Sequence, residues 1–233
     1  MPSRVVRLVN AAGFELVFGL IALTAGAWAF GALAEELVEG NTQADTRVAA
    51  WLHEHATPAW TTVFENVTRI GNLVTLIAVV VVASIVLFRM RRIAELQLLL
   101  LASIGAEIIT VGLKLGFERQ RPFFADPLAT ESTYSFPSGH ASVSLAVYGT
   151  LGYIAARHLG NRSAQLGVLA AAVSLVLLIG FSRLYLGVHF LTDVIAGFSI
   201  GLAWVALCVV LLHLRLRLKA RRGDQTSRYR AST

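Results

Sequence analysis

Long runs of apolar residues constrain the fold of this chain more than any other feature. A helix needs roughly 20 apolar residues to cross the hydrocarbon core of a bilayer. Six segments approach this length, and they cover residues 11–33, 70–88, 96–116, 139–156, 164–181 and 190–214. The chain is 56% hydrophobic and 15% charged, a composition typical of membrane proteins. The sequence therefore predicts an all-α integral membrane protein with six transmembrane helices.

The first apolar segment has two interpretations. Arg4 and Arg7 precede it, and small residues around Ala32 resemble the cleavage site of a signal peptide. The segment is longer than the apolar core of a typical signal peptide and contains Glu15, which favours a retained helix.

Basic residues are divided unequally between the two sides that six spans would create. With a cytoplasmic N-terminus, 14 of the 20 lysines and arginines lie inside. The outer side keeps Arg47, Arg69, Lys114, Arg119, Arg121 and Arg183. Because cytoplasmic loops are enriched in Lys and Arg, this bias predicts a multi-pass plasma-membrane protein with both termini in the cytoplasm.

The segments outside the spans differ in character. Residues 1–214 form one predicted membrane domain, and residues 215–233 are basic and polar, which predicts a disordered cytoplasmic tail. Between the first two spans, residues 41–69 are too polar to cross. Val48, Trp51 and Leu52 have helical spacing, which predicts an interfacial helix. This segment is either a connecting lid or a part of the substrate entrance.

Charge and cysteine content exclude some partners. The formal net charge is +6, but no basic stripe with interleaved aromatic residues is present, so we expect no nucleic-acid partner. Cys208 is the single cysteine, which excludes an internal disulfide and a cysteine metal site. The oligomeric state stays open.

Three polar clusters lie at predicted span ends on the outer side. They are Lys114 with Arg121 and Pro122; Pro137, Ser138, Gly139 and His140; and Ser182, Arg183, His189 and Asp193. Ionisable residues at membrane depth are costly and are therefore functional candidates.

Each cluster alone has an ordinary explanation, but together their chemistry is coherent. Cations such as Arg183 suit a dianionic phosphate, although a cation at a span end also snorkels. A Pro-Ser-Gly helix start leaves backbone N–H groups for an anion, and many helices begin this way. His189 and Asp193 are four apart, so a carboxylate can reach the imidazole, although such pairs are often structural.

The combined pattern resembles the type 2 phosphatidic acid phosphatase superfamily. That family has Lys, six residues, Arg-Pro; then Pro-Ser-Gly-His; then Ser-Arg, five residues, His, three residues, Asp. Here the segments read KLGFERQRP, PSGH and SRLYLGVHFLTD, and all eleven fixed positions are present between Lys114 and Asp193. The six-span layout matches bacterial members over nearly the whole chain.

The resemblance implies a role for each motif residue. His189 would attack phosphorus and form a phosphohistidine, Asp193 would orient it, and His140 would protonate the leaving oxygen. The residues implied to hold the phosphoryl oxygens are Lys114, Arg121, Ser138, Gly139 and Arg183. No metal or other cofactor is expected, because the carboxylate cluster that a divalent ion would need is absent.

The implied activity is hydrolysis of a lipid phosphate or diphosphate in the membrane. Phosphatidylglycerol phosphate, phosphatidic acid and undecaprenyl diphosphate are substrates of bacterial members, and an outward-facing site favours undecaprenyl diphosphate and hence cell-wall biogenesis. The alternatives are a phosphotransferase and a non-catalytic lipid-phosphate binder. A non-catalytic protein is expected to lose His140 or His189, and both are retained.

Other residues have two interpretations each. Glu107 precedes Lys114 by two helical turns and either lines a substrate cavity, pairs with a motif cation or bonds a neighbouring helix. His53 and His55 suggest a metal, but two such residues without further ligands are more often solvated. Gly197 and Gly201 predict close helix packing, within the monomer in preference to a dimer.

Overall fold

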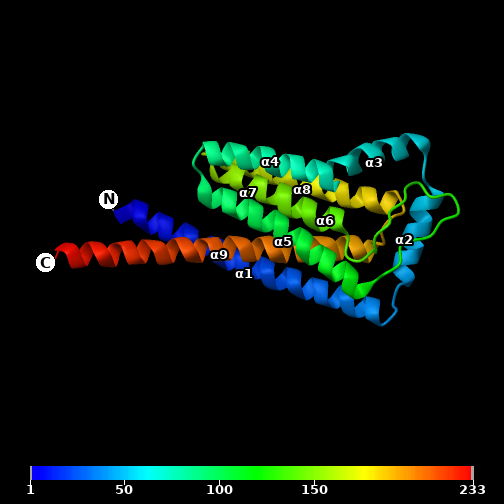
Figure 1. The fold of residues 1–233 in the computed structure, drawn as a ribbon, viewed down its shortest axis with the longest axis horizontal. Helices are drawn as coiled ribbons and strands as arrows, with labels where there is room; N and C mark the ends of the chain where they lie inside the picture. Colours follow the sequence, from blue (N-terminus) through cyan, green and yellow to red (C-terminus); the bar gives the residue numbers. More distant parts are fainter. Residues whose placement is uncertain (1, 232–233) are drawn as a thin grey trace.

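The computed structural model describes the backbone of residues 2–231 and the side chains of residues 16–218. This part of the chain is helical and contains no strand. The long helices are α1 (Pro2–Val38), α4 (Leu73–Arg89), α5 (Ile93–Phe117), α8 (Arg162–Tyr185) and α9 (Leu191–Ala231). In the centre of the bundle, α6 (Gly139–Ser144), the π-helix η1 (Leu145–Gly149) and α7 (Thr150–Arg157) follow one another without a break. The shorter helices α2 (Gln43–Glu54) and α3 (Pro58–Ile70) lie at one end (Figure 1).

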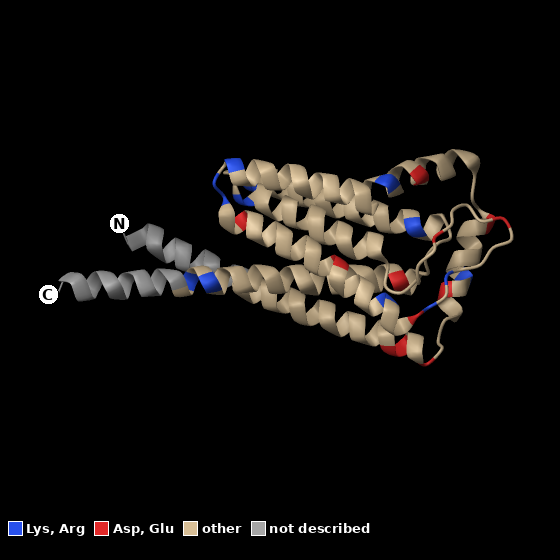
Figure 2. Cartoon of the chain, in the orientation of Figure 1, with Lys and Arg blue, Asp and Glu red and all other residues tan. Residues whose placement is uncertain are grey.

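The helix lengths and apolar surfaces identify an integral membrane protein. Four segments of the described chain are long and apolar enough to cross a bilayer, namely Leu16–Val38, Ile93–Phe117, Arg162–Tyr185 and Leu191–Leu218. A fifth is made by α3 and α4 together, which are bent by 43° relative to one another. Figure 2 shows that charged residues gather at the two ends of the bundle and are rare in its middle. A bilayer requires this distribution, because charges are costly in hydrocarbon.

The polar segment 41–69 contains two helices where the sequence had predicted one. Leu52 of α2 is buried against Ala141, Leu184 and Val194, which belong to α6, α8 and α9. Trp51, in contrast, is exposed. The helical spacing noted in the sequence therefore places one face of α2 over the end of the bundle.

At the C-terminal end, where the sequence predicts a disordered tail, α9 is drawn as a helix to Ala231, and the prediction of disorder stays untested. Leucine, alanine, lysine and arginine are good helix formers, so the helix of the last apolar segment extends into the basic residues. At the other terminus, α1 is helical from Pro2 onward, while the side chains of Arg4, Arg7 and Glu15 lie outside the described part.

Gly197 and Gly201 allow α9 to approach α6 very closely. A Cβ atom on Gly197 would lie 2.6 Å from the carbonyl oxygen of Ser138, and one on Gly201 would lie 2.8 Å from that of Ser142. The predicted close packing within the monomer is therefore confirmed. This contact also joins the Pro-Ser-Gly-His segment to the helix that begins beside His189.

We expect Gly197→Val to lower the stability of the folded protein by about 1–3 kcal/mol, because the added side chain must push α6 away from α9. Gly167→Val is the matched control, since a Cβ there meets nothing within 4 Å. Thermal unfolding in detergent measures both. Equal melting temperatures for the two variants would contradict the close approach.

Candidate active site

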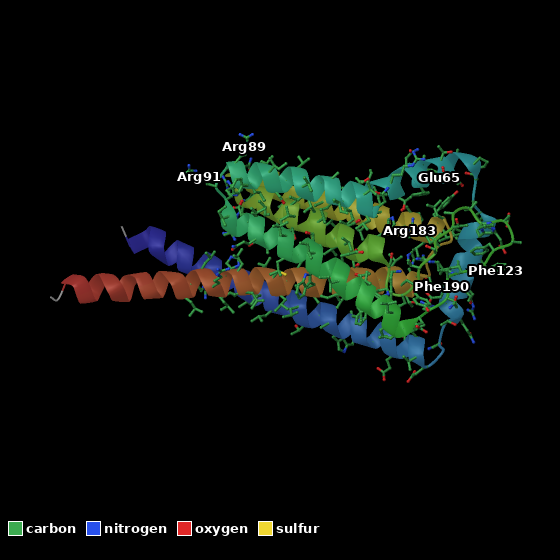
Figure 3. The ribbon with its side chains drawn as sticks, in the orientation of Figure 1. Glu65, Arg89, Arg91, Phe123, Arg183 and Phe190 are labelled. Carbon is green, nitrogen blue, oxygen red and sulfur yellow. The ribbon has the colours of Figure 1, made fainter. Side chains whose placement is uncertain are left out.

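The three polar clusters meet at one end of the bundle, around a cavity of about 220 Å³. Six of the eight motif residues proposed from the sequence line it: Lys114, Arg121, Gly139, His140, Arg183 and His189. In Figure 3, Arg183 and Phe190 lie at the same end as Phe123, and Arg89 and Arg91 lie at the opposite end. Segments distant in the sequence thus form one compact site.

A turn at the end of α8 places His189 close to Arg183. Gly187 has a φ of +68°, a left-handed conformation that glycine adopts without a steric penalty. The N–H of Gly187 donates to the carbonyl of Leu184, and the N–H of Val188 donates to that of Arg183. This pair of bonds is the Schellman motif that ends many helices. The motif fixes the path of the five residues that separate Arg183 from His189.

The ring of His189 has a partner at each nitrogen. Nδ1 lies 3.3 Å from Oδ2 of Asp193, in the first turn of α9. Nε2 lies 3.1 Å from Nη1 of Arg121, and guanidinium nitrogens only donate. Nε2 therefore accepts, which assigns the proton to Nδ1. The lone pair of Nε2 faces the cavity, as a nucleophile requires.

Burial of His189 lowers the pKa of its imidazole to about 4, despite the opposing effect of the Asp193 carboxylate. Desolvation disfavours the charged form of the ring more than the carboxylate favours it. The imidazole is consequently neutral at physiological pH and keeps the Nε2 lone pair.

Asp193 lies behind the histidine, is fully buried, and has partners at both oxygens. Its Oδ1 accepts from Nη1 of Arg119 at 2.5 Å. Its Oδ2 accepts from the backbone N–H of Phe190 at 2.7 Å and from the hydroxyl of Ser135. These bonds fix the carboxylate against His189, and the sequence analysis had assigned no role to Arg119 or Ser135.

Arg119 bridges Asp193 to a second buried carboxylate. Its Nη2 lies 2.6 Å from Oδ2 of Asp45, which comes from α2. Asp45 also accepts from the backbone N–H of Thr192 at 2.9 Å, so it holds the start of α9 directly. Arg119 lies between the fixed positions of the first motif, but no local spacing connects it to Asp45. We call this chain, Asp45 with Arg119 and Asp193, the carboxylate bridge.

The three motif cations are held by the loop that follows α5. Lys114 donates to the carbonyl of Tyr134, and Nε of Arg121 donates to the carbonyl of Thr133 at 2.6 Å. Nη2 of Arg183 forms an ion pair with Glu131, a cavity-lining acid that the sequence analysis did not single out. The cavity is therefore lined by three cations and two carboxylates, Glu131 and Glu107, so its cations are in excess, which suits an anion.

The Pro-Ser-Gly-His segment differs from the sequence expectation at Ser138. Its backbone N–H is not free for an anion, because it donates to the carbonyl of Asp193 at 2.9 Å. Its side chain is fully buried and does not line the cavity. Gly139 and His140 line the cavity instead, and the His140 ring forms no hydrogen bond within the part of the chain whose side chains are described.

His53 is not the solvated residue that the sequence suggested. Its Nε2 lies 3.0 Å from Asp126, and its ring stacks on Phe124 at a centroid distance of 4.0 Å. It therefore fixes the loop to α2. His55 instead stacks on Trp51. Within residues 16–218 no group of three or more His, Cys, Asp or Glu side chains is arranged to hold a metal ion.

Comparisons with known proteins agree with the motif pattern. The family model for the PAP2 superfamily matches residues 95–217. This is more than half of the chain, and it includes all three motifs. The chain belongs to the PAP2 superfamily.

A curated relative and a crystal structure, both from Bacillus subtilis, and a more distant structure are similar to this PAP2 protein. Phosphatidylglycerophosphatase B of B. subtilis strain 168 is 36% identical over 155 residues, which cover 65% of this chain and 71% of the relative. The crystal structure of a transmembrane PAP2 type phosphatidylglycerolphosphate phosphatase from B. subtilis matches with a TM-score of 0.69 and 30% identity, covering 89% of this chain and 96% of that one. LpxE of Aquifex aeolicus shares the fold, with a TM-score of 0.56 and 24% identity over 72% of this chain and 93% of that chain.

We expect Arg119→Gln to destabilise this PAP2 protein by about 3–5 kcal/mol, because it leaves two buried carboxylates without their shared cation. Thermal unfolding measures the loss. Arg47→Gln on α2 is the control, since its guanidinium is exposed and contacts only Gln43, at 3.3 Å.

The carboxylate bridge makes the loss depend on Asp45. In an Asp45→Asn background, Arg119 has only the Asp193 carboxylate to neutralise. The loss of stability caused by Arg119→Gln should therefore be smaller there. Equal losses in both backgrounds would contradict the bridge.

Proposed function

We propose that this protein is a metal-independent lipid phosphatase that acts through a phosphohistidine at His189. The observation that supports this most is the orientation of His189, whose Nδ1–H faces Asp193 while Nε2 faces the cavity with its three cations. A neutral imidazole that is unprotonated at Nε2 attacks phosphorus once a phosphate takes over the Arg121 guanidinium, and fixed cations stabilise the charge on the transferring phosphoryl group.

In the first step, Nε2 of His189 forms a bond to phosphorus as the bond from phosphorus to the lipid oxygen breaks. His140, which takes up a proton when the dianionic phosphate binds beside it, gives that proton to the lipid oxygen. Asp193 stabilises the positive charge that develops on the His189 ring. The lipid alcohol leaves, and the phosphoryl group stays on His189.

In the second step, water hydrolyses the phosphohistidine. His140, now neutral, takes a proton from the water as its oxygen attacks phosphorus and the bond from phosphorus to Nε2 breaks. Phosphate leaves and His140 is protonated again. Lys114, Arg121, Arg183 and the backbone of Gly139 hold the phosphoryl oxygens in both steps, while Ser138 positions this segment on α9 through its N–H.

The B. subtilis relative and the B. subtilis crystal structure favour phosphatidylglycerol phosphate as the substrate, because the names of both give this activity. Phosphatidic acid presents the same phosphomonoester to the cavity, and undecaprenyl diphosphate, which the predicted orientation alone had favoured, presents a terminal phosphate. A panel of these three lipids, assayed for phosphate release, identifies the preferred one.

We propose six spans: the five described above and the helical segment 139–157, which is the fourth along the chain. Its length is roughly 28 Å at 1.5 Å per residue, close to the thickness of the hydrocarbon core. Six spans leave both termini on the cytoplasmic side and the site on the extracytoplasmic side. The position of Arg89 and Arg91, opposite the site, supports this orientation (Figure 3).

Replacing each histidine by alanine should separate their roles. A lipid alkoxide leaves only with a proton, whereas a nitrophenolate leaves without one, so His140→Ala should slow lipid hydrolysis by roughly 10² to 10⁴ and aryl phosphate hydrolysis far less. His189→Ala should abolish both. Rapid quench should detect an acid-labile phosphoenzyme in the wild type, and excess chelator should leave activity unchanged.

Three outcomes would refute parts of this mechanism. If His140→Ala lowers the rates on both substrates equally, His140 is not the general acid. If His189→Ala keeps substantial aryl phosphatase activity, His189 is not the nucleophile. Activity that is lost with chelator and restored by magnesium excludes a metal-independent reaction. Each variant is first checked for folding and phosphate binding.

Thiol labelling in intact cells tests the orientation. In a Cys208→Ala background, Phe123→Cys should react with an impermeant reagent, because this side chain is 93% exposed in the loop at the site end. Met90→Cys, exposed at the opposite end, should react only after the cells are opened. The reverse pattern would place the site in the cytoplasm.

A further inference from the structure

A second cavity, of about 400 Å³, adjoins the one with the three cations. It is lined by α4, α5 and the segment formed by α6 and η1, and almost all of its lining residues are apolar. The residues that line both cavities are Leu73, Leu76, Glu107 and Val143. A phosphate among the cations therefore has apolar space beside it for the rest of a lipid.

Glu107 is the one ionisable side chain at this junction. In the apolar cavity the other polar lining residue is Ser103, whose hydroxyl already donates to the carbonyl of Leu99 at 2.7 Å. The Glu107 carboxyl has no hydrogen-bond partner in the part of the chain whose side chains are described, and it is half-buried. A partly buried polar group without a partner is costly, so the Glu107 carboxyl at this position points to a partner that the protein itself does not supply.

The position of Glu107 defines the part of a lipid that it meets. It precedes Lys114 by seven residues on α5, which is roughly 10 Å along the helix axis. A glycerophospholipid has ester groups within a few bonds of its phosphate. A polyprenyl phosphate has hydrocarbon directly after the phosphate oxygen. A carboxyl group donates to an ester carbonyl when protonated and accepts from a hydroxyl when ionised.

We propose that Glu107 forms a hydrogen bond with the glycerol backbone of the substrate and thereby favours glycerolipid phosphates over polyprenyl phosphates. This inference rests on the proposed lipid phosphatase activity. A bare carboxyl against the first methylenes of a polyprenyl chain stays without a partner, whereas the ester region of a glycerolipid satisfies it. Recognition of this kind discriminates mainly by leaving a polar group unpaired in the wrong complex.

The test compares Glu107→Leu and Glu107→Gln on phosphatidic acid and on a polyprenyl monophosphate, so that the phosphate is the same in both substrates. Glu107→Leu should lower kcat/KM for phosphatidic acid roughly 3- to 10-fold, the usual effect of one hydrogen bond, through KM more than kcat. Activity on the polyprenyl phosphate should be unchanged or higher. Glu107→Gln should retain most of the activity on phosphatidic acid, because an amide both donates and accepts.

Ser103→Ala is the matched control, one turn away on α5 and in the same apolar cavity. It should leave both substrates unaffected. If Glu107→Leu lowers kcat/KM equally for both substrates, Glu107 acts through Lys114 or through folding, and the inference is wrong. It is equally wrong if Glu107→Leu changes kcat/KM for neither substrate. A wild-type protein that releases phosphate from neither lipid, nor from phosphatidylglycerol phosphate, would instead overturn the phosphatase function itself.

Discussion

A buried carboxylate in a membrane helix is stable only when its charge is matched, and the site is organised around the way Asp193 meets this requirement. Arg119 supplies the matching charge, and the Phe190 amide and Ser135 hydroxyl fill the remaining acceptor positions. Because Arg119 also contacts Asp45, the short helix α2 is tied to the base of α9. The orientation of His189 thus depends on residues that never approach the cavity.

Close backbone contact gives the site its second source of rigidity. Gly197 and Gly201 bring α9 onto α6, and the Ser138 amide donates to the Asp193 carbonyl across the same contact. The His140 segment and the His189 segment are therefore parts of one packed unit. Small residues at helix contacts are the usual means of such approach in membranes. Two histidines held in this way keep their relative geometry without depending on flexible loops.

The location of the site suits a lipid phosphate, whose phosphate is soluble in water and whose chains are soluble in the bilayer. Phosphate requires cations and access to water, and lipid chains require an apolar surface, so a site at the end of the bundle provides both. Lys114 and Arg183 lie on the polar side, while Leu76 and Val143 continue into the apolar cavity. Glu131 forms an ion pair with Arg183, so in the proposed reaction the phosphate competes with this carboxylate for the guanidinium.

The sequence alone determined the long apolar helices, their order and the motif residues, because apolar length and short spacings are properties of a contiguous chain. The turn at Gly187 is such a local feature, and it sets Arg183 beside His189. Only the tertiary structure brought Asp45 to Thr192, 147 residues away, and Arg119 to Asp193, 74 residues away. It also showed that the Ser138 amide is already bonded and that Glu107 lies between two cavities. These features depend on which helix faces which, and no periodicity within one helix specifies its partner on another.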